Sequence, residues 1–290
     1  MVCKTEENMV HIIADSTCDL SKDLVEKYGI IIQPLYIHLG EEEYQDGVTI
    51  TPDEIYRWSE ETKETPKTAA VSMADMLDLY EKYSADGDEI ICFSISDDMS
   101  TTGNVMRMAA EEMDAQDRIF VVNSANLSTG IGLLVLEAAT MAQNGMCAKD
   151  IVAKIEELKP LVRASFVVDT LTYLHRGGRC SGVAALAGGM LKLHPRIGVE
   201  DGKMGPGKKY RGKMSSVILE YVKDMEEDLK TANTDRVFIT HSGCDQEIID
   251  EVRSYLEQLN RFDEILVTRA GGVISSHCGP GTLGVLFIAG

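Results

Sequence analysis

The sequence lacks the features that mark several large classes of protein. No apolar run approaches the roughly 18 residues that span a bilayer, and residues 1–15 contain no long apolar stretch typical of a signal peptide. The seven cysteines are odd in number, scattered and never spaced as Cys-x-x-Cys. These absences predict reduced thiols in a cytoplasmic protein and argue against a disulfide framework or a zinc site.

Positive charge is scarce. The 28 Lys and Arg residues face 47 Asp and Glu residues, which gives a formal net charge of −19. Such a chain repels a phosphate backbone, so we expect no nucleic-acid partner.

Motifs of catalysis are also absent. There is no Gly-x-Ser-x-Gly elbow of an α/β-hydrolase and no Walker-type phosphate loop. No cluster of His, Cys, Asp and Glu has metal-ligand spacing, so we expect neither a metal nor a cofactor.

The first half of the chain alternates apolar, β-branched runs with amphipathic stretches, a pattern typical of α/β proteins. Helices are predicted over 19–29, from Thr51 and from Ser72, the last two with an acidic residue three positions after the cap. The pattern predicts a mostly parallel sheet covered on both faces. Its strands are predicted at 10–15, 30–37, 88–95 and 117–124.

After about residue 160 the pattern changes. An Asp-Gly pair at 201–202 predicts a hairpin, and Val217, Ile218, Tyr221, Val222 and Met225 form the apolar face of a helix. Further strands are predicted at 164–170, 236–242, 264–269 and 284–290. We therefore expect two closely packed domains, an α/β/α domain with a parallel sheet over 1–160 and an α/β domain with a mixed sheet over 161–290.

The stretch Gly279–Gly284 spells Gly-x-Gly-x-x-Gly, as in a dinucleotide-binding loop. A strand-like run follows it instead of a helix, and the sequence contains no acidic residue about 20 positions further on, so the dinucleotide interpretation fails. Two interpretations remain: a tight turn into the last strand, or a backbone loop that faces an anionic ligand together with His277.

Hydroxyl groups gather after the predicted strands. Asp15, Ser16 and Thr17 follow the first strand; Ser96, Ser100, Thr101 and Thr102 follow the third, just before a helix. Such residues either cap the helix or bind a carboxylate or phosphate at its N-terminus.

Several segments together resemble the DegV family of bacterial fatty-acid-binding proteins. They run in order from IIADSTCDL through YQDGVTITPDEIY, KTAAVS, SISDDMSTTGNVMRMAA, VVNSANLSTGIGLL and DTLTYLHRGGR to HCGPGTLGV. The resemblance implies a long-chain fatty acid in a tunnel at the junction of two domains. It also implies a lipid-binding subunit without catalytic activity of its own, which presents the carboxylate to a separate ATP-dependent fatty acid kinase subunit that makes acyl phosphate for phospholipid metabolism.

The resemblance also implies the ligand-binding residues. Thr68 of KTAAVS would bind the carboxylate and Arg179 would lie near the pocket mouth. The other expected ligand-binding residues are Ser96, Ser100, His277 and Gly279. If the His277 imidazole is charged and helps to hold the anion, binding should weaken at high pH.

Several positions depart from the family's usual motifs. Ala69, Ala70 and Val71 replace Ser-Gln-Pro after Thr68, Asp97 and Thr101 stand where serine and glycine are typical, and Asn123 replaces an aspartate. A carboxylate at Asp97 would repel a bound carboxylate if it pointed inward.

Positive side chains gather in one region of this acidic chain. They are Arg176, Arg179, Lys208, Lys209, Arg211 and Lys213. These residues either form a solvated surface or bind a partner. The partner would be the kinase subunit or, transiently, an anionic membrane.

Two further functions stay open. One is an autonomous small-molecule kinase or hydrolase that uses the hydroxyl-rich strand ends, and the other is binding of a different anionic amphiphile.

Overall fold

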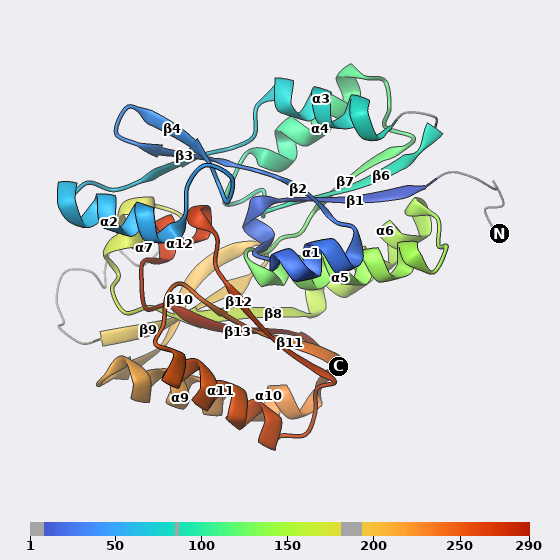
Figure 1. Cartoon of the computed structure of the whole chain (residues 1–290). Helices are drawn as coiled ribbons and strands as arrows, with labels where there is room; N and C mark the ends of the chain where they lie inside the picture. Colours follow the sequence, from blue (N-terminus) through green and yellow to red (C-terminus); the bar gives the residue numbers. More distant parts are fainter. Residues whose placement is uncertain (1–8, 85–86, 181–192) are drawn as a thin grey trace.

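The computed structural model describes residues 9–84, 87–180 and 193–290, and stacks sheets and helices in layers (Figure 1). The first sheet has the order β2-β1-β6-β7 and is parallel throughout. Its strands are β1 (Val10–Asp15), β2 (Ile31–Gln33), β6 (Glu89–Ser94) and β7 (Ile119–Asn123). Helices α3 (Met73–Tyr83) and α4 (Thr102–Glu112) cover one face, and α1 (Lys22–Tyr28), α5 (Thr129–Gln143) and α6 (Ala148–Leu158) cover the other. The predicted parallel sheet is confirmed.

The helix starts follow local signals in the sequence. Helix α2 (Pro52–Thr62) begins at a capping box in which the Glu54 carboxylate accepts from the Thr51 N–H at 2.8 Å. Helix α3 begins at a second capping box, formed by Ser72 and Asp75. Each box satisfies N–H groups that a helix N-terminus leaves unpaired.

The single strand predicted over 30–37 is wrong. Strand β2 ends at Gln33, and Tyr36–Leu39 forms β3, which pairs with β4 (Glu42–Gln45) and β5 (Lys67–Ala69) in a separate antiparallel sheet. Pro34 lies between β2 and β3 and has no N–H to continue a ladder. This break creates the small sheet that carries Thr68.

The second large sheet has six strands in the order β10-β9-β8-β13-β11-β12. Only β11 and β12 run parallel, so the predicted mixed sheet is confirmed. The β9–β10 hairpin turns at Asp201 and Gly202, both with positive φ. The strands are β8 (Val162–Val167), β9 (Leu193–Glu200), β10 (Lys203–Arg211), β11 (Ala232–His241), β12 (Glu264–Arg269) and β13 (Leu283–Ala289).

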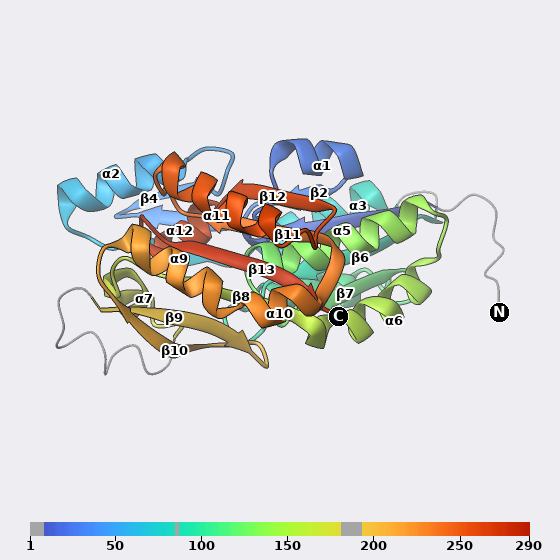
Figure 2. The ribbon, with the colours of Figure 1, turned by 90° about the horizontal axis from the view of Figure 1, so that it is seen from below.

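Helices cover the outer face of this sheet, as Figure 2 shows from below. They are α9 (Met214–Asp224), α10 (Glu226–Thr231) and α11 (Gln246–Gln258). The predicted apolar face of α9 is confirmed, because its members are all buried.

Helix α5 joins the two halves of the chain. It packs on β1 and on strands β8 and β13 of the other sheet, and its first eight residues are buried. One apolar cluster runs from Ile12 and Phe93 through Leu133 to Phe166 and Leu286. The expected close packing is confirmed. The division into domains 1–160 and 161–290 stays a prediction, although the strands of the two large sheets separate at this point.

Within the described ranges no helix is both long and apolar enough to cross a membrane. The six cysteines of these ranges form no disulfide bond with one another. Cys3 lies outside the described residues.

Candidate functional site

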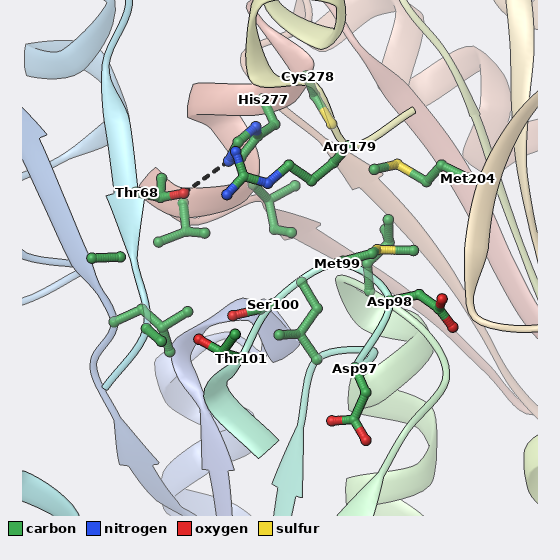
Figure 3. A pocket seen from close by; sticks show the side chains of 17 residues that line it. Thr68, Asp97, Asp98, Met99, Ser100, Thr101, Arg179, Met204, His277 and Cys278 are labelled. Carbon is green, nitrogen blue, oxygen red and sulfur yellow. Dashed lines mark hydrogen bonds between the residues drawn. The ribbon is translucent and has the colours of Figure 1, made fainter. Parts of the chain in front are cut away.

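A cavity of about 450 Å³ opens between the small sheet, the loop after β6 and helix α12 (Gly272–Cys278) (Figure 3). Its volume falls within the range of about 300–1,000 Å³ that is typical of small-molecule sites. Most of the lining is apolar. The apolar lining residues are Leu35, Ala69, Ala70, Ile95, Met99, Leu127, Met204, Val273, Ile274 and Cys278.

Thr68 and His277 meet on one wall of this cavity. Thr68 lies on β5, which is held in place by pairing with Ile37 of β3, and His277 lies in the last turn of α12. The Thr68 Oγ1 and the His277 Nε2 are 2.9 Å apart (Figure 3). The fold thus brings together two residues that the sequence placed in one site.

The environment of His277 decides its charge. Burial, and then the nearby positive charge of Arg179, lower the pKa of His277 to about 4. The imidazole of the ligand-free protein is therefore neutral at neutral pH, contrary to an imidazolium that holds the anion. Its Nδ1 atom is buried and has no hydrogen-bond partner among the described residues. The neutral ring contacts Thr68 through Nε2, and its Nδ1 faces Gly177.

Helix α7 (Thr172–Gly177) and the residues after it complete this wall. The Arg179 side chain extends beside the His277 ring (Figure 3), and its Nη1 donates to the Gly177 carbonyl at 2.7 Å. A Cβ atom at Gly177 would lie 2.3 Å from His277 Nδ1, so only glycine leaves room for the imidazole in this position. The exposed Arg179 supplies a cation at the cavity.

Ser100 and Thr101 line the cavity below Thr68 in Figure 3. The Ser100 hydroxyl lies 2.9 Å from that of Thr102 and accepts from the Thr102 N–H at 3.2 Å, at the start of α4. Ser100 therefore takes part in capping α4 and also faces the cavity, so the two interpretations of this hydroxyl cluster are compatible.

Asp97 also lines the cavity, but its carboxylate is paired. Arg107 of α4 donates to it at 2.9 Å, and Figure 3 shows the side chain directed away from Thr68 and Arg179. The Asn123 side chain accepts from the N–H groups of Ala125 and Asp97. The repulsion that an inward carboxylate would cause is absent from this arrangement.

Ser96 and Gly279 lie outside the cavity lining. The Ser96 hydroxyl donates to the Gly202 carbonyl at 2.7 Å, and so holds the β9–β10 turn. Gly279 ends α12, and its N–H donates to the Ser275 carbonyl at 2.9 Å. The glycine loop thus serves as the turn from α12 into β13. As ligand contacts, both residues stay predictions.

Sequence reasoning missed part of the apolar wall. Met204 comes from β10 in the second half and faces the cavity together with Met99 (Figure 3). Met204 carries no local signal, because only the docking of the hairpin against the β6 loop brings it there. The Nζ atom of Lys203, the residue before Met204, lies 3.5 Å from the Oδ1 atom of Asp98 in that loop.

A second, narrow cavity of about 20 Å³ adjoins the first. The two share Leu127, Ile274 and Cys278 as lining residues. Beyond them the small cavity reaches Phe166 and Leu286 of the mixed sheet. The small cavity therefore lies between the first cavity and the mixed sheet, and its lining also contains the polar residues Ser128, Thr240, His241, Ser242 and Thr282.

Among the side chains that the structure describes, no group of three or more His, Cys, Asp or Glu residues could hold a metal ion.

Comparison with known proteins finds a family match over nearly the whole chain. The model of the DegV family, described as uncharacterised proteins, matches residues 9–290. A DegV domain-containing protein of Caldanaerobacter subterraneus subsp. tengcongensis is 31% identical over 280 residues, which are 96% of this chain and 98% of that protein.

Two solved structures extend the similarity to the fold. A structure described as fatty acid binding of a DegV family protein from Thermus thermophilus has a TM-score of 0.89 and 30% identity, and the match covers 97% of this chain and 99% of that one. A stearic-acid-binding protein from Eubacterium ventriosum has a TM-score of 0.83 and 29% identity, covering 97% and 98%. The fold class predicted from the sequence is confirmed.

Proposed function

The chain belongs to the DegV family, and we propose that it binds a long-chain fatty acid in the cavity beside Thr68 and His277. The observation that carries the proposal is the Thr68–His277 pair, placed beside Arg179 at a mostly apolar cavity. The fatty-acid-binding descriptions of the similar structures from Thermus thermophilus and Eubacterium ventriosum support it.

The polar wall suits a carboxylate. A carboxylate removed from water costs several kcal/mol unless donors or a cation replace its hydration. Here the Thr68 hydroxyl and the Arg179 guanidinium can do so. If Nε2–H donates to the Thr68 oxygen, the Thr68 hydroxyl proton is available to the ligand.

The apolar wall suits an acyl chain. Each buried methylene contributes roughly 0.8 kcal/mol, so a long chain can supply most of the affinity. The inward run from Met99 and Met204 past Leu127 toward Phe166 supports a tunnel between the two sheets. Flexible thioethers adapt to a bent chain.

We further propose that the protein presents the carboxylate to a separate ATP-dependent kinase subunit in the cytoplasm and has no catalytic activity of its own. The exposure of Arg179 at the head-group end supports access by a partner. The rival, an autonomous kinase or hydrolase, is tested by incubating the purified protein with ATP and fatty acid. Acyl phosphate or ADP formed without a partner would favour the rival.

The binding proposal is tested by extracting the purified protein with organic solvent and identifying what copurifies by mass spectrometry. A stripped sample is then titrated with a fluorescent long-chain fatty acid. Copurified fatty acid and saturable binding with a micromolar or lower dissociation constant are expected. A different anionic amphiphile in the extract, with no fatty-acid binding, would replace the proposed ligand.

A further inference from the structure

Two buried carboxylates hold the start of the helix that carries His277. Asp46, just after β4, accepts from the Gly272 N–H at 2.6 Å, the Val273 N–H at 3.3 Å and the Ser16 hydroxyl at 2.8 Å. Asp19 accepts from the Gly271 N–H at 2.7 Å. The three bonds from residues 271–273 join positions more than 220 apart, so residues near the start of the chain hold a helix near its end.

The two aspartates and the start of α12 are buried and closely packed. Asp46 is 3% exposed and Asp19 is 5% exposed. A Cβ atom at Gly272 would lie 2.8 Å from the Asp46 Oδ1 and 2.6 Å from Ile37 of β3. Glycine at position 272 therefore allows the N–H groups of α12 to reach the carboxylate, and the helix dipole favours negative charge there.

We propose that Asp46 and Asp19 are positioning residues of the head-group site: they fix α12, and through it the His277 ring against Thr68. Helix α12 is short, and His277 lies five residues after Gly272, about 7.5 Å along the axis. A displacement of the helix start is therefore carried to the imidazole. The inference rests on the proposed function only for its effect on ligand affinity.

Substitutions of Asp46 and Asp19 should disturb the start of α12 to different degrees. Asp46→Asn puts an amide NH₂ group opposite an N–H donor, because both Asp46 oxygens accept from α12. Asp19→Asn can keep both of its bonds, since its other oxygen accepts from the Ser128 hydroxyl, which can instead accept from an amide. Glu54→Gln is the control: it weakens the exposed cap of α2, a helix that packs on α12 but carries none of the head-group residues.

The first measurement needs no ligand. In Asp46→Asn, the ¹⁵N and ¹H NMR signals of the His277 ring should shift from their parent values, because the Thr68–His277 bond lengthens or breaks. In Glu54→Gln they should stay unchanged, and in Asp19→Asn they should move less than in Asp46→Asn. Unmoved His277 signals in a folded Asp46→Asn protein would overturn the inference whatever the ligand is.

The second measurement is fatty-acid affinity. Asp46→Asn should weaken binding about tenfold, and the loss should largely disappear when His277 is already replaced by alanine. Equal loss in both backgrounds would mean a general structural effect and would overturn the inference. If His277→Ala itself binds as tightly as the parent, the proposed head-group site fails instead.

Circular dichroism and thermal unfolding show whether each variant is folded, and the His277 signals are compared only among folded variants. Should Asp46→Asn not fold, Asp19→Ala takes its place, because it removes the acceptor of the Gly271 N–H at the start of α12. The same His277 shift is then expected. Parent-like His277 signals in a folded Asp19→Ala protein would overturn the inference in that case.

Discussion

The Thr68 hydroxyl and the His277 imidazole lie 2.9 Å apart although 209 positions separate them in the chain. Thr68 stands on a three-residue strand and His277 in the last turn of a seven-residue helix. Neither element would be stable alone. The pair exists because β3 and the two aspartates hold these elements in place.

Thr68→Val should weaken fatty-acid binding by about 1.5–3 kcal/mol, the range for a hydrogen bond to a charged group. Valine keeps the shape of threonine and removes the hydroxyl. Titration of stripped protein with a labelled fatty acid measures the change. Thr65→Val is the control, because the Thr65 hydroxyl accepts from Arg176 and does not line the cavity. An unchanged dissociation constant for Thr68→Val would remove Thr68 from the site.

Gly177→Ala should weaken binding more than Gly178→Ala. A Cβ atom at Gly177 collides with His277 Nδ1, whereas one at Gly178 meets no atom within 4 Å and only strains a backbone with φ of +66°. The first variant displaces the imidazole, and the second costs about 1 kcal/mol of stability. Affinity and the free energy of unfolding, measured on both variants, separate the effects. Equal affinities would show that the ring position is unimportant.

The pKa of His277 should be about 4 in the ligand-free protein. A bound carboxylate stabilises the imidazolium and should raise this pKa. By linkage, affinity should rise as the pH falls from about 6 toward 4 and should not depend on His277 above pH 7. NMR titration of the His277 ring, with and without fatty acid, measures both values. A pKa near 6.5 without fatty acid would contradict the argument that burial lowers it. The ring would then be partly charged at neutral pH.

Asp15 should make the protein less stable as the pH rises. Burial is the main cause that raises the pKa of this carboxyl to about 6, from 3.8 in the unfolded chain. The stability from its protonated form is complete below about pH 3.8 and is lost as the pH rises through about 6. The free energy of unfolding of the parent, relative to Asp15→Asn, should therefore fall by about 3 kcal/mol between pH 4 and 7. A pH-independent difference in urea unfolding would contradict this.

Replacing Lys208, Lys209 and Arg211 with glutamine should slow association with the kinase subunit or with anionic vesicles at low salt, and should leave fatty-acid affinity unchanged. All three lie on the edge strand β10, outside the cavity. Lys208 pairs with Asp224 and Glu220, so its charge is partly offset and the effect should be modest.

The control for this surface is an equal loss of charge elsewhere. Lys22, Lys149 and Lys154 are exposed on α1 and α6, and their replacement with glutamine should leave the rate of association unchanged. If both triple variants associate like the parent at low salt, the basic residues of β10 serve only to keep an edge strand soluble.

The sequence alone determined the elements whose causes are local. The capping boxes at Thr51 and Ser72 and the hairpin turn at Asp201 and Gly202 depend on neighbours within a few positions, and all three are present. The alternation of strands and helices likewise predicted the parallel and the mixed sheet. The predicted strand over 30–37 failed because Pro34 divides it between two sheets, a choice that pairing partners far along the chain decide.

Tertiary structure alone decided the chemistry of the candidate site. The motifs named Thr68, His277 and Arg179, but the charge of His277 follows from its desolvation by the packed halves. The Asp97 carboxylate would repel a bound carboxylate if its charge were not paired with Arg107 of α4. Desolvation and ion pairing depend on which groups surround an atom in space, and segments that are far apart in the sequence meet only when the whole chain folds.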